Sequence, residues 1–374
     1  MKRLRLLSAL GFLLLIFGGM TGVIINLSSG SLRALDDKVS LPNILDGQLA
    51  ISFDALVNKA TPASAALNGW IDGLIFAVTG DAGPQVRGGC AGWLYLTEEI
   101  VETPHGEAHL AQRVALAKVI AGLLAERGVK LLVVPVPDKV SLAQEGLCGL
   151  PVSAQARSRA GLWAQASAGL ASAGLASAGL AVRQVDVVAD WPVPGYWRTD
   201  THWNRDGAHH AARRVAAAAV LEIGPGQQAI RLETAGEAQP RVGDLLRLAN
   251  LERTAATLGP APDEDTSVTA VIERTGGLLD EAPAPSVLLA GSSYSLNSGF
   301  LDYLQAEMSR EVVQKSHAGG GFAGALLDVL EKDPELLSRI ELVVWEWPQR
   351  VLMQPLTAQE QRFLKQYGGS GQPR

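Results

Sequence analysis

Residues 286–295, SVLLAGSSYS, join a continuous apolar run to a turn of small residues. An uninterrupted apolar run of this length is typical of a strand that is covered on both faces, as in parallel sheets. A serine in the turn that follows lies at the carboxyl edge of the sheet, where small neighbours leave room for a substrate and for backbone N–H donors. Ser293 is therefore a candidate nucleophile, although the same residues also fit the N-cap of a following helix.

A second motif lies upstream, in residues 196–204, YWRTDTHWN. Asp200 and His202 are two positions apart, and in extended backbone such positions share a face, so the carboxylate can orient the imidazole through one ring nitrogen. The other nitrogen can then accept a proton from a serine, because histidine exchanges protons readily near neutral pH. Asp200 and His202 are candidate partners of Ser293, and the flanking aromatic residues predict a wall that stacks on a sugar or excludes water.

The chain around these motifs alternates between short apolar runs and segments with helical periodicity. This alternation predicts an α/β fold with a mainly parallel sheet and helices on both faces, in which the site lies at the carboxyl ends of the strands. The expected strands are residues 92–96, 130–136, 183–188, 286–290, 311–315 and 341–345, and the expected helices are 55–78, 109–127, 155–181, 206–222 and 318–330.

Two segments depart from this alternation. Residues 166–180 repeat the sequence ASAGL three times in tandem, which we interpret as an expansion of a peripheral helix or its loop. Residues 223–284 are rich in Pro, Gly, Asp and Thr, and predict an irregular connection with one helix-like piece near residues 243–246. A connection of that length is often functional or mobile.

A glycine-rich stretch, residues 319–324 (GGGFAG), matches the G-x-G-x-x-G pattern of dinucleotide-binding loops, and Glu346 ends the next strand. Only one strand is expected after it, and an exported protein has little nicotinamide cofactor to bind. We therefore interpret the glycines as a turn beside the nucleophile, with Gly320 and Gly321 as candidate oxyanion donors, and expect no cofactor. The further candidates for oxyanion stabilisation or substrate contact are Ser292, Tyr294, Trp203 and Arg198.

Two more histidines, His209 and His210, follow His202 in an Ala/Arg-rich helical segment. Their spacing matches neither the H-E-x-x-H pattern nor the cysteine-based patterns of zinc sites. We expect no metal.

The N-terminal segment predicts a membrane anchor. Lys2, Arg3 and Arg5 precede an uncharged run of 22 residues, 6–27, which is long enough to cross a bilayer core of about 30 Å. Basic residues before the run place the N-terminus in the cytoplasm and the rest of the chain outside, as in a single-pass membrane protein. A cleaved signal peptide is the alternative reading.

Composition limits the class of protein. The chain has 374 residues and a formal net charge of −6, with no cluster of basic residues beyond the first few, so nucleic acid is not an expected partner. Cys90 and Cys148, 58 residues apart, could form one disulfide of an exported protein or remain separate thiols. We divide the chain into an anchor or signal peptide (1–27), a linker with a helical lead-in (28–85), the main domain (86–352) and a C-terminal tail (353–374).

Four ordered motifs together resemble the periplasmic alginate O-acetyltransferase family of the AlgJ/AlgX type. They are GWLYL at 92–96, DTHW at 200–203, GSSYS at 291–295 and WEWPQR at 345–350, and the likeness covers roughly residues 85–352. This sequence departs from the family where Ser292 replaces a usual Thr and where Gln349 replaces a common acid.

The resemblance implies an SGNH-hydrolase-like (flavodoxin-like) domain with a circularly permuted motif order, because Asp200 and His202 precede Ser293 in the chain. It also implies that Ser293 is the nucleophile, that a membrane-bound O-acyltransferase supplies the acetyl group and that an exopolysaccharide accepts it. The resemblance further implies that the membrane is a bacterial inner membrane and that the main domain lies in the periplasm. Glu346 and Arg350 could contact substrate or form a structural ion pair.

The function expected from these observations is transfer of an acetyl group, through a seryl-acetyl intermediate, to hydroxyl groups of an alginate-like exopolysaccharide. Two alternatives remain open at this point. One is an esterase that removes acetyl groups from the polymer, and the other is a non-catalytic scaffold of an export complex.

Overall fold

The computed structural model describes residues 13, 17–21, 39–41, 43, 47–60, 64–172, 182–273 and 284–368. The chain divides into two compact units, Met1–Leu74 and Ile75–Arg374. The lead-in contains two helices, α3 (Gln48–Ala60) and α4 (Ser64–Thr79), where the sequence analysis expected one over 55–78. Pro62 lies between them in the sequence, and proline disfavours an uninterrupted helix because it lacks an N–H donor and restricts the preceding residue.

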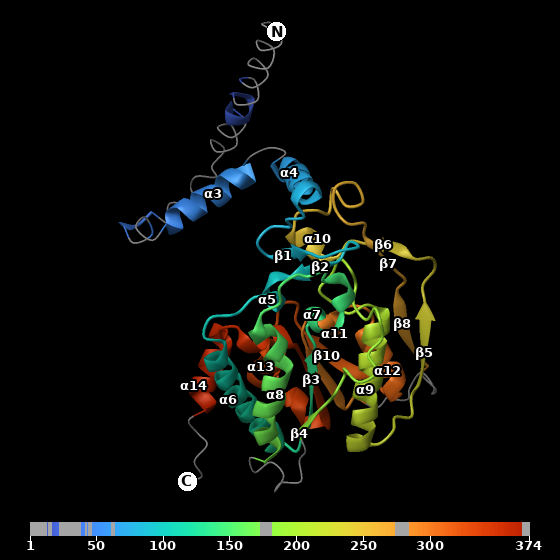
Figure 1. Ribbon diagram of the computed structural model, residues 1–374. Helices are drawn as coiled ribbons and strands as arrows, with labels where there is room; N and C mark the ends of the chain where they lie inside the picture. The colour runs from blue at the N-terminus through green and yellow to red at the C-terminus, as the bar shows by residue number, and fades with distance from the viewer. Residues whose placement is uncertain are drawn as a thin grey trace, which may run out of the picture. The chain divides into compact units, whose positions relative to one another are not determined.

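The centre of the second unit is a five-stranded parallel sheet, as the sequence predicted (Figure 1). The strand order is β10-β9-β11-β3-β4, and every neighbouring pair in it is parallel. The bounds are β3 Lys130–Val136, β4 Val182–Gln184, β9 Val287–Gly291, β10 Val312–Ser316 and β11 Leu342–Pro348.

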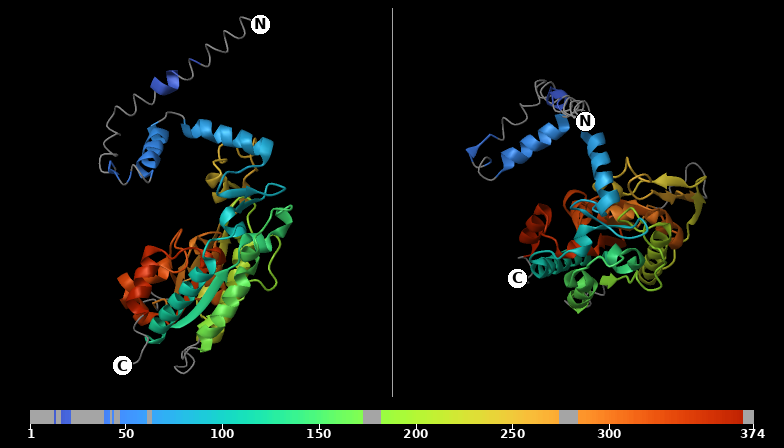
Figure 2. Two further views of the ribbon diagram at one scale, coloured as in Figure 1. Left: turned by 60° about the vertical axis from the view of Figure 1, so that its left-hand side comes forward. Right: turned by 45° about the horizontal axis from the view of Figure 1, so that its top comes forward.

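Helices cover both faces of this sheet (Figures 1 and 2). Successive side chains of a strand point to opposite faces, so Val287 and Leu289 of β9 join one hydrophobic cluster, and Leu288 and Ala290 join the other. The first cluster includes residues of α9 and α12, and the second includes residues of α6, α8, α13 and α14. The bounds are α6 Gly106–Ala125, α8 Ala154–Ser172, α9 Arg205–Ile223, α12 Phe300–Met308, α13 Gly324–Lys332 and α14 Ala358–Tyr367.

The connection 223–284 is more regular than the sequence analysis expected. It contains two antiparallel strand pairs, β5 with β8 and β6 with β7, and one short helix, α10. The strands escaped prediction because they lie in two-stranded pairs and lack a continuous apolar run. The bounds are β5 Ala229–Thr234, β6 Gln239–Arg241, α10 Asp244–Leu248, β7 Asp263–Asp265 and β8 Val268–Glu273.

Short elements complete the second unit. β1 pairs with β2 in antiparallel fashion at the start of the domain, and the remaining elements are single turns of helix. Their bounds are β1 Val86–Gly88, β2 Leu94–Leu96, α5 Thr97–Ile100, α7 Lys139–Leu142, η2 Gln144–Gly146, α11 Ser293–Leu296, η4 Pro334–Arg339 and η5 Gln349–Met353.

The segment 353–374, expected to be a C-terminal tail, contains a helix that packs on the domain. Helix α14 packs on α6 and α13, and its Phe363 is buried. Glu360 accepts a hydrogen bond of 2.8 Å from the buried Arg113 of α6. The pair Thr357 and Glu360 forms a capping box, a sequence signal that could have predicted this helix.

The N-terminal apolar run, residues 6–27, lies mostly outside the described residues; residues 13 and 17–21 of it are helical. Within the described ranges, α6 is the helix that is long and apolar enough to cross a membrane. Its Leu116, Ile120 and Leu124 are fully buried in the hydrophobic cluster of the second unit, so α6 is a core helix of that unit. The tandem repeat, residues 166–180, is described only as far as Ser172, the last residue of α8.

Cys90 and Cys148 are joined by a disulfide, with their Cα atoms 5.7 Å apart. The bond connects the turn before β2 to the segment after η2, where Cys90 N also donates to Gly146 O at 2.9 Å. Cross-linking residues this far apart in the sequence restricts the unfolded chain.

Replacing both cysteines with serine is expected to lower the free energy of unfolding by about 2–4 kcal/mol, because the open chain regains the entropy of a 58-residue loop. Urea unfolding monitored by circular dichroism measures the change. A reducing agent should destabilise the wild-type protein and leave the double variant unaffected. Equal stability of the two proteins without reductant would contradict this account.

Candidate active site

The three residues proposed from the two motifs lie in hydrogen-bond contact at the carboxyl edge of the sheet. Ser293 is the first residue of α11, directly after β9. His202 Nε2 lies 2.8 Å from Ser293 Oγ, and His202 Nδ1 lies 2.5 Å from Asp200 Oδ1. Asp200 and His202 are buried, with exposed fractions of 2% and 6%. This is the geometry in which a histidine can exchange a proton with a serine while a carboxylate fixes its orientation.

The backbone between Asp200 and His202 is not extended, which corrects one step of the sequence argument. Residues 198–202 form a series of bends, and the main-chain N–H of His202 donates to Asp200 Oδ1 at 3.0 Å. The same carboxylate oxygen therefore contacts both the backbone and the ring of His202. The short spacing brings the two groups together through this tight turn.

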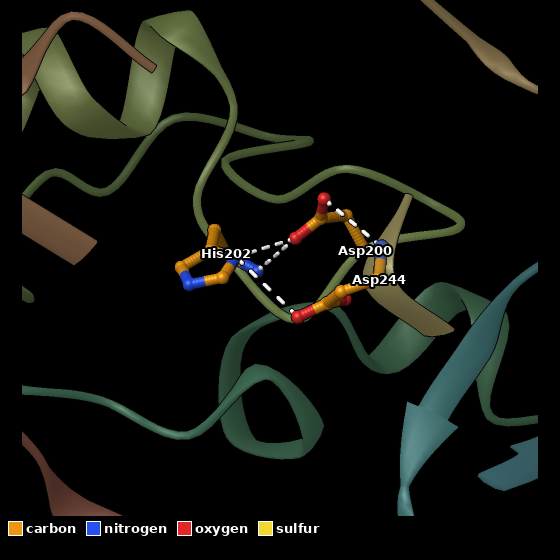
Figure 3. Close-up of side chains that lie close together, drawn as sticks. All are labelled: Asp200, His202 and Asp244. Carbon is orange, nitrogen blue, oxygen red and sulfur yellow. Dashed lines mark hydrogen bonds and ion pairs between the residues drawn. The ribbon is translucent and has the colours of Figure 1, made fainter. Parts of the chain in front are cut away.

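A second carboxylate, Asp244, lies on the same side of the imidazole as Asp200. Figure 3 shows both carboxylates near Nδ1, while the other ring nitrogen points away from them. Asp244 Oδ2 is 3.6 Å from Nδ1, compared with 2.5 Å for Asp200 Oδ1, and Asp244 accepts hydrogen bonds from Thr201 N and Oγ1 at 2.7 and 2.5 Å. Asp244 therefore holds the backbone of the His202 loop, and Asp200 is the direct partner of the ring.

Asp200 is held as a carboxylate. Burial by itself raises its pKa, but the hydrogen bond from His202 and the charges of His202 and Arg241 outweigh burial and hold the pKa well below its usual range. Arg241 Nη2 donates to Asp200 Oδ2 at 3.0 Å. The pKa of Asp244 is raised by burial and by the nearby charge of Asp200. The two acids thus differ in their environment, and Asp200 is the better stabiliser of a protonated imidazole.

Asp200, His202 and Asp244 place three potential metal ligands within 4.8 Å of one another. Each carboxylate oxygen of the two acids already accepts a hydrogen bond from a protein donor, with Arg241 and Thr201 among the donors. We therefore interpret the cluster as a hydrogen-bond network. His209 and His210 of α9 contact different partners, since His209 Nε2 is 2.7 Å from Glu307 and the His210 ring packs edge-on against Trp191.

Comparison with known proteins places this geometry in a family. A family model described as the SGNH hydrolase-like domain of acetyltransferase AlgX matches residues 86–349. The chain belongs to this family. The match spans the whole of the sheet and all three residues of the candidate site, and it confirms the resemblance drawn from the four sequence motifs.

Similar proteins have related names. The probable alginate O-acetylase AlgJ of Pseudomonas syringae pv. tomato is 29% identical over 346 residues, covering 88% of this chain and 86% of the relative. The probable alginate O-acetylase AlgJ of Pseudomonas aeruginosa is 27% identical over 358 residues, covering 88% and 87%. The solved O-acetyltransferase domain of Pseudomonas putida AlgJ is 26% identical, with a TM-score of 0.65, and covers 77% of this chain and 100% of that structure. The SGNH-like α/β fold is thereby confirmed.

Glu346, a family-motif residue of β11, organises the turn that carries the candidate nucleophile, Ser293. Its buried carboxylate accepts hydrogen bonds from Ser292 N and Oγ, both at 2.8 Å, and from Ser295 N and Oγ at 3.2 and 2.6 Å. Burial raises the pKa of Glu346, although these hydrogen bonds oppose the rise. A Cβ on Gly291 would lie 2.1 Å from Ser295 Oγ and 2.7 Å from Glu346 Oε2, so glycine is required there.

The ion pair between Glu346 and Arg350 considered in the sequence analysis does not form. Arg350 instead donates from Nη1 to Tyr294 Oη at 3.2 Å and to Glu99 Oε1 at 3.4 Å. Tyr294 Oη donates in turn to Thr201 O at 2.8 Å, and its ring packs 4.8 Å from the ring of His202. Arg350 therefore contacts the loop that carries His202 indirectly, through the hydroxyl group of Tyr294.

Lys139, at the carboxyl end of β3, was missed by the sequence analysis. It is fully buried, and its Nζ donates to Leu94 O at 2.6 Å and to Arg198 O and Asp200 O at 2.9 Å each. Burial lowers the pKa of Lys139 to about 8, and the charge of Glu99 opposes this shift. A polar pair, Asp138 and Lys139, directly after a buried strand was the available signal.

The secondary candidates have mixed outcomes. Tyr294 and Trp203 are fully buried beneath the site, where they pack edge-on at 5.2 Å, so their side chains are not substrate contacts. Both polar groups of Ser292 are bound to Glu346, so it is not an oxyanion donor. Gly320 N already donates a hydrogen bond to His317 O, at 2.9 Å.

Two of the secondary candidates stay predictions. Gly321 lies in the same turn after β10 and has φ of +61°, a conformation suited to glycine. Arg198 is partly exposed, and its guanidinium donates to Asp263, Ala91 O and Ala261 O at 3.1 to 3.4 Å. It therefore connects three segments at the edge of the site.

Proposed function

We propose that this protein is an O-acetyltransferase that carries an acetyl group on Ser293 before transferring it to a hydroxyl group of an exopolysaccharide. The observation that carries the proposal is the pair of contacts made by His202, at 2.8 Å to Ser293 and 2.5 Å to Asp200. The names of its relatives, alginate O-acetylases, support an acetyl group as the cargo and an alginate-like polymer as the acceptor.

The proposed reaction has two halves that share one proton carrier. In the first half, His202 Nε2 takes the proton of Ser293 Oγ, the oxygen attacks the acetyl carbonyl of a donor ester, and the donor alcohol leaves with that proton. In the second half, a sugar hydroxyl gives its proton to His202 Nε2 and attacks the acetyl-serine. Ser293 then leaves as the alkoxide and recovers the proton, so the enzyme is regenerated and only the acetyl group has moved.

The cellular setting is part of the proposal. We propose that residues 6–27 anchor the chain in the inner membrane with the α/β domain in the periplasm, where the disulfide between Cys90 and Cys148 is stable. We further propose that a membrane-bound O-acyltransferase supplies the acetyl group across that membrane.

The test is a product analysis with the full chain in detergent, p-nitrophenyl acetate as donor, and oligosaccharide acceptors of two kinds, oligouronates and neutral hexose oligomers. Mass spectrometry should detect sugar with an added acetyl group, in amounts that depend on the acceptor concentration. Release of acetate alone, at the same rate with and without acceptor, would indicate an esterase and contradict the proposal. Absence of both products would favour a scaffold.

A further inference from the structure

A pocket of about 470 Å³ lies where β5 and β8 approach the β6–β7 pair. It is lined by residues 235–237 and 239–241, together with Asp265 and Ser267. Pockets that bind small molecules have volumes of roughly 300–1,000 Å³. This pocket can therefore hold sugar rings, and it is far larger than an acetyl group requires.

Arg241 connects this pocket to the candidate active site. Arg241 is one of the residues that line the pocket, and its Nη2 donates to Asp200 Oδ2 at 3.0 Å and to Asn297 Oδ1 at 3.4 Å. Asn297 Nδ2 donates in turn to the main-chain carbonyl of Ser293 at 2.8 Å. A ligand in the pocket would thus be separated from the Asp200 carboxylate by one side chain, Arg241, and from the Ser293 backbone by two, Arg241 and Asn297.

The polar groups of the pocket suit hydroxyl groups. Arg241 Nη1 is 3.6 Å from Asp265, and both residues line the pocket. Asp265 is balanced by two hydrogen bonds from Arg205, at 2.7 and 3.0 Å, and Glu237 is an exposed acid on the rim. A sugar hydroxyl can accept from the guanidinium and donate to a carboxylate, whereas a small anion would meet the acids with nothing to donate.

The arrangement of Arg241 is fixed by its surroundings. The guanidinium packs over the ring of Trp197, with 5.3 Å between the guanidinium carbon and the ring centroid. Asp200 and Trp197 together hold the position of Arg241 beside the pocket.

We propose that this pocket binds a pyranose ring of the acceptor glycan, next to the sugar whose hydroxyl is acetylated. The proposal rests on the proposed function and adds an acceptor subsite to it. The recognised chemistry is a ring with several hydroxyl groups, which neutral hexose polymers and polyuronates share. Transfer to a glycan then requires the pocket, whereas hydrolysis of a small ester does not.

Filling the pocket tests this inference. Ala235→Trp places a bulky side chain in the lining, and Thr234→Trp places the same side chain at the neighbouring exposed position of β5, which does not line the pocket. With the full chain in detergent, we expect Ala235→Trp to lower acetyl transfer to oligosaccharides at least tenfold while p-nitrophenyl acetate hydrolysis stays within twofold. Thr234→Trp should match the wild type in both assays. Oligouronates and neutral hexose oligomers, tested separately, distinguish the two sources of the ring.

Equal transfer by the two tryptophan variants would overturn the subsite, and so would a parallel loss of transfer and hydrolysis in Ala235→Trp. Binding of the same oligosaccharides to Ser293→Ala protein, measured by calorimetry, gives a readout that is independent of acetyl chemistry. We expect Ala235→Trp in that background to weaken binding at least tenfold, and unchanged affinity would overturn the inference. If wild-type protein binds glycan but never acetylates it, the proposed function fails while the subsite stands.

Discussion

Replacing Ser293 with alanine is expected to lower the rate of p-nitrophenyl acetate cleavage by a factor on the order of 10³ or more. The side-chain oxygen 2.8 Å from His202 Nε2 is the atom proposed to form the acetyl intermediate, and alanine has no atom that can replace it. Intact-mass spectrometry after brief exposure to the ester should detect an added acetyl group on the wild-type protein and none on the variant.

The matched control is Ser158→Ala. Ser158 lies on the exposed side of α8, and its Oγ donates only to the nearby Gln155 O at 3.0 Å. This variant should cleave the ester at the wild-type rate and become acetylated as the wild type does. Ser293→Ala protein that retains wild-type activity and unfolds at the same temperature would rule out Ser293 as the nucleophile.

Replacing Asp200 with asparagine is expected to reduce the same rate by up to about 10⁴-fold. Asparagine presents either an amide N–H₂ or a neutral carbonyl to His202 Nδ1. The first removes the acceptor at 2.5 Å, and the second removes the negative charge that stabilises the protonated ring. Steady-state kinetics across a pH series should give a lower kcat for the variant than for the wild type at every pH.

Asp244→Asn is the matched comparison, because it removes the same charge from the second carboxylate on the Nδ1 side of His202. Its oxygen is 3.6 Å from the ring nitrogen and is bound mainly to Thr201, so the loss should be less than tenfold. A larger loss in Asp244→Asn than in Asp200→Asn would show that Asp244 is the acid that orients the ring. Thermal unfolding of both variants checks that neither effect comes from a loss of fold.

The central strands could be predicted from the sequence because their signal is local. The run 130–136 was predicted as a strand, and β3 has the same bounds. A strand buried on both faces is apolar at nearly every position, and the short length and valine content of this run distinguish it from a buried helix. The strands β5 to β8 lack this apolar run. They form two-stranded pairs near the surface, so their side chains are only partly buried.

The helix α14 was missed for a related reason. Only one side of it touches the domain, and its few buried residues, Phe363 among them, are separated by polar ones. The capping box formed by Thr357 and Glu360 was a usable signal, but such four-residue patterns are common outside helices as well.

The candidate triad could be predicted because its two parts are short motifs, each with its own chemistry. Asp200 and His202 are adjacent through a tight turn, and Ser293 follows a strand that the sequence defines clearly. The residues that hold the triad had weaker signals, since Lys139 only follows a buried strand, Glu346 only belongs to a family motif and Arg241 has no motif at all. Lys139, Arg241 and Glu346 reach it from three separate parts of the chain, and each is a charged residue of a kind that is usually exposed.

The sequence by itself therefore determined the central strands, the α/β class and the residues proposed to react, since each depends on neighbours within a few positions. The tertiary structure decided which partners the buried charges have: Glu346 holds the serine turn, Lys139 and Arg350 support the histidine loop, and Arg241 joins Asp200 to a pocket. Burying a charge is unfavourable unless a partner meets it, and those partners come together only when distant loops converge at the carboxyl edge of the sheet.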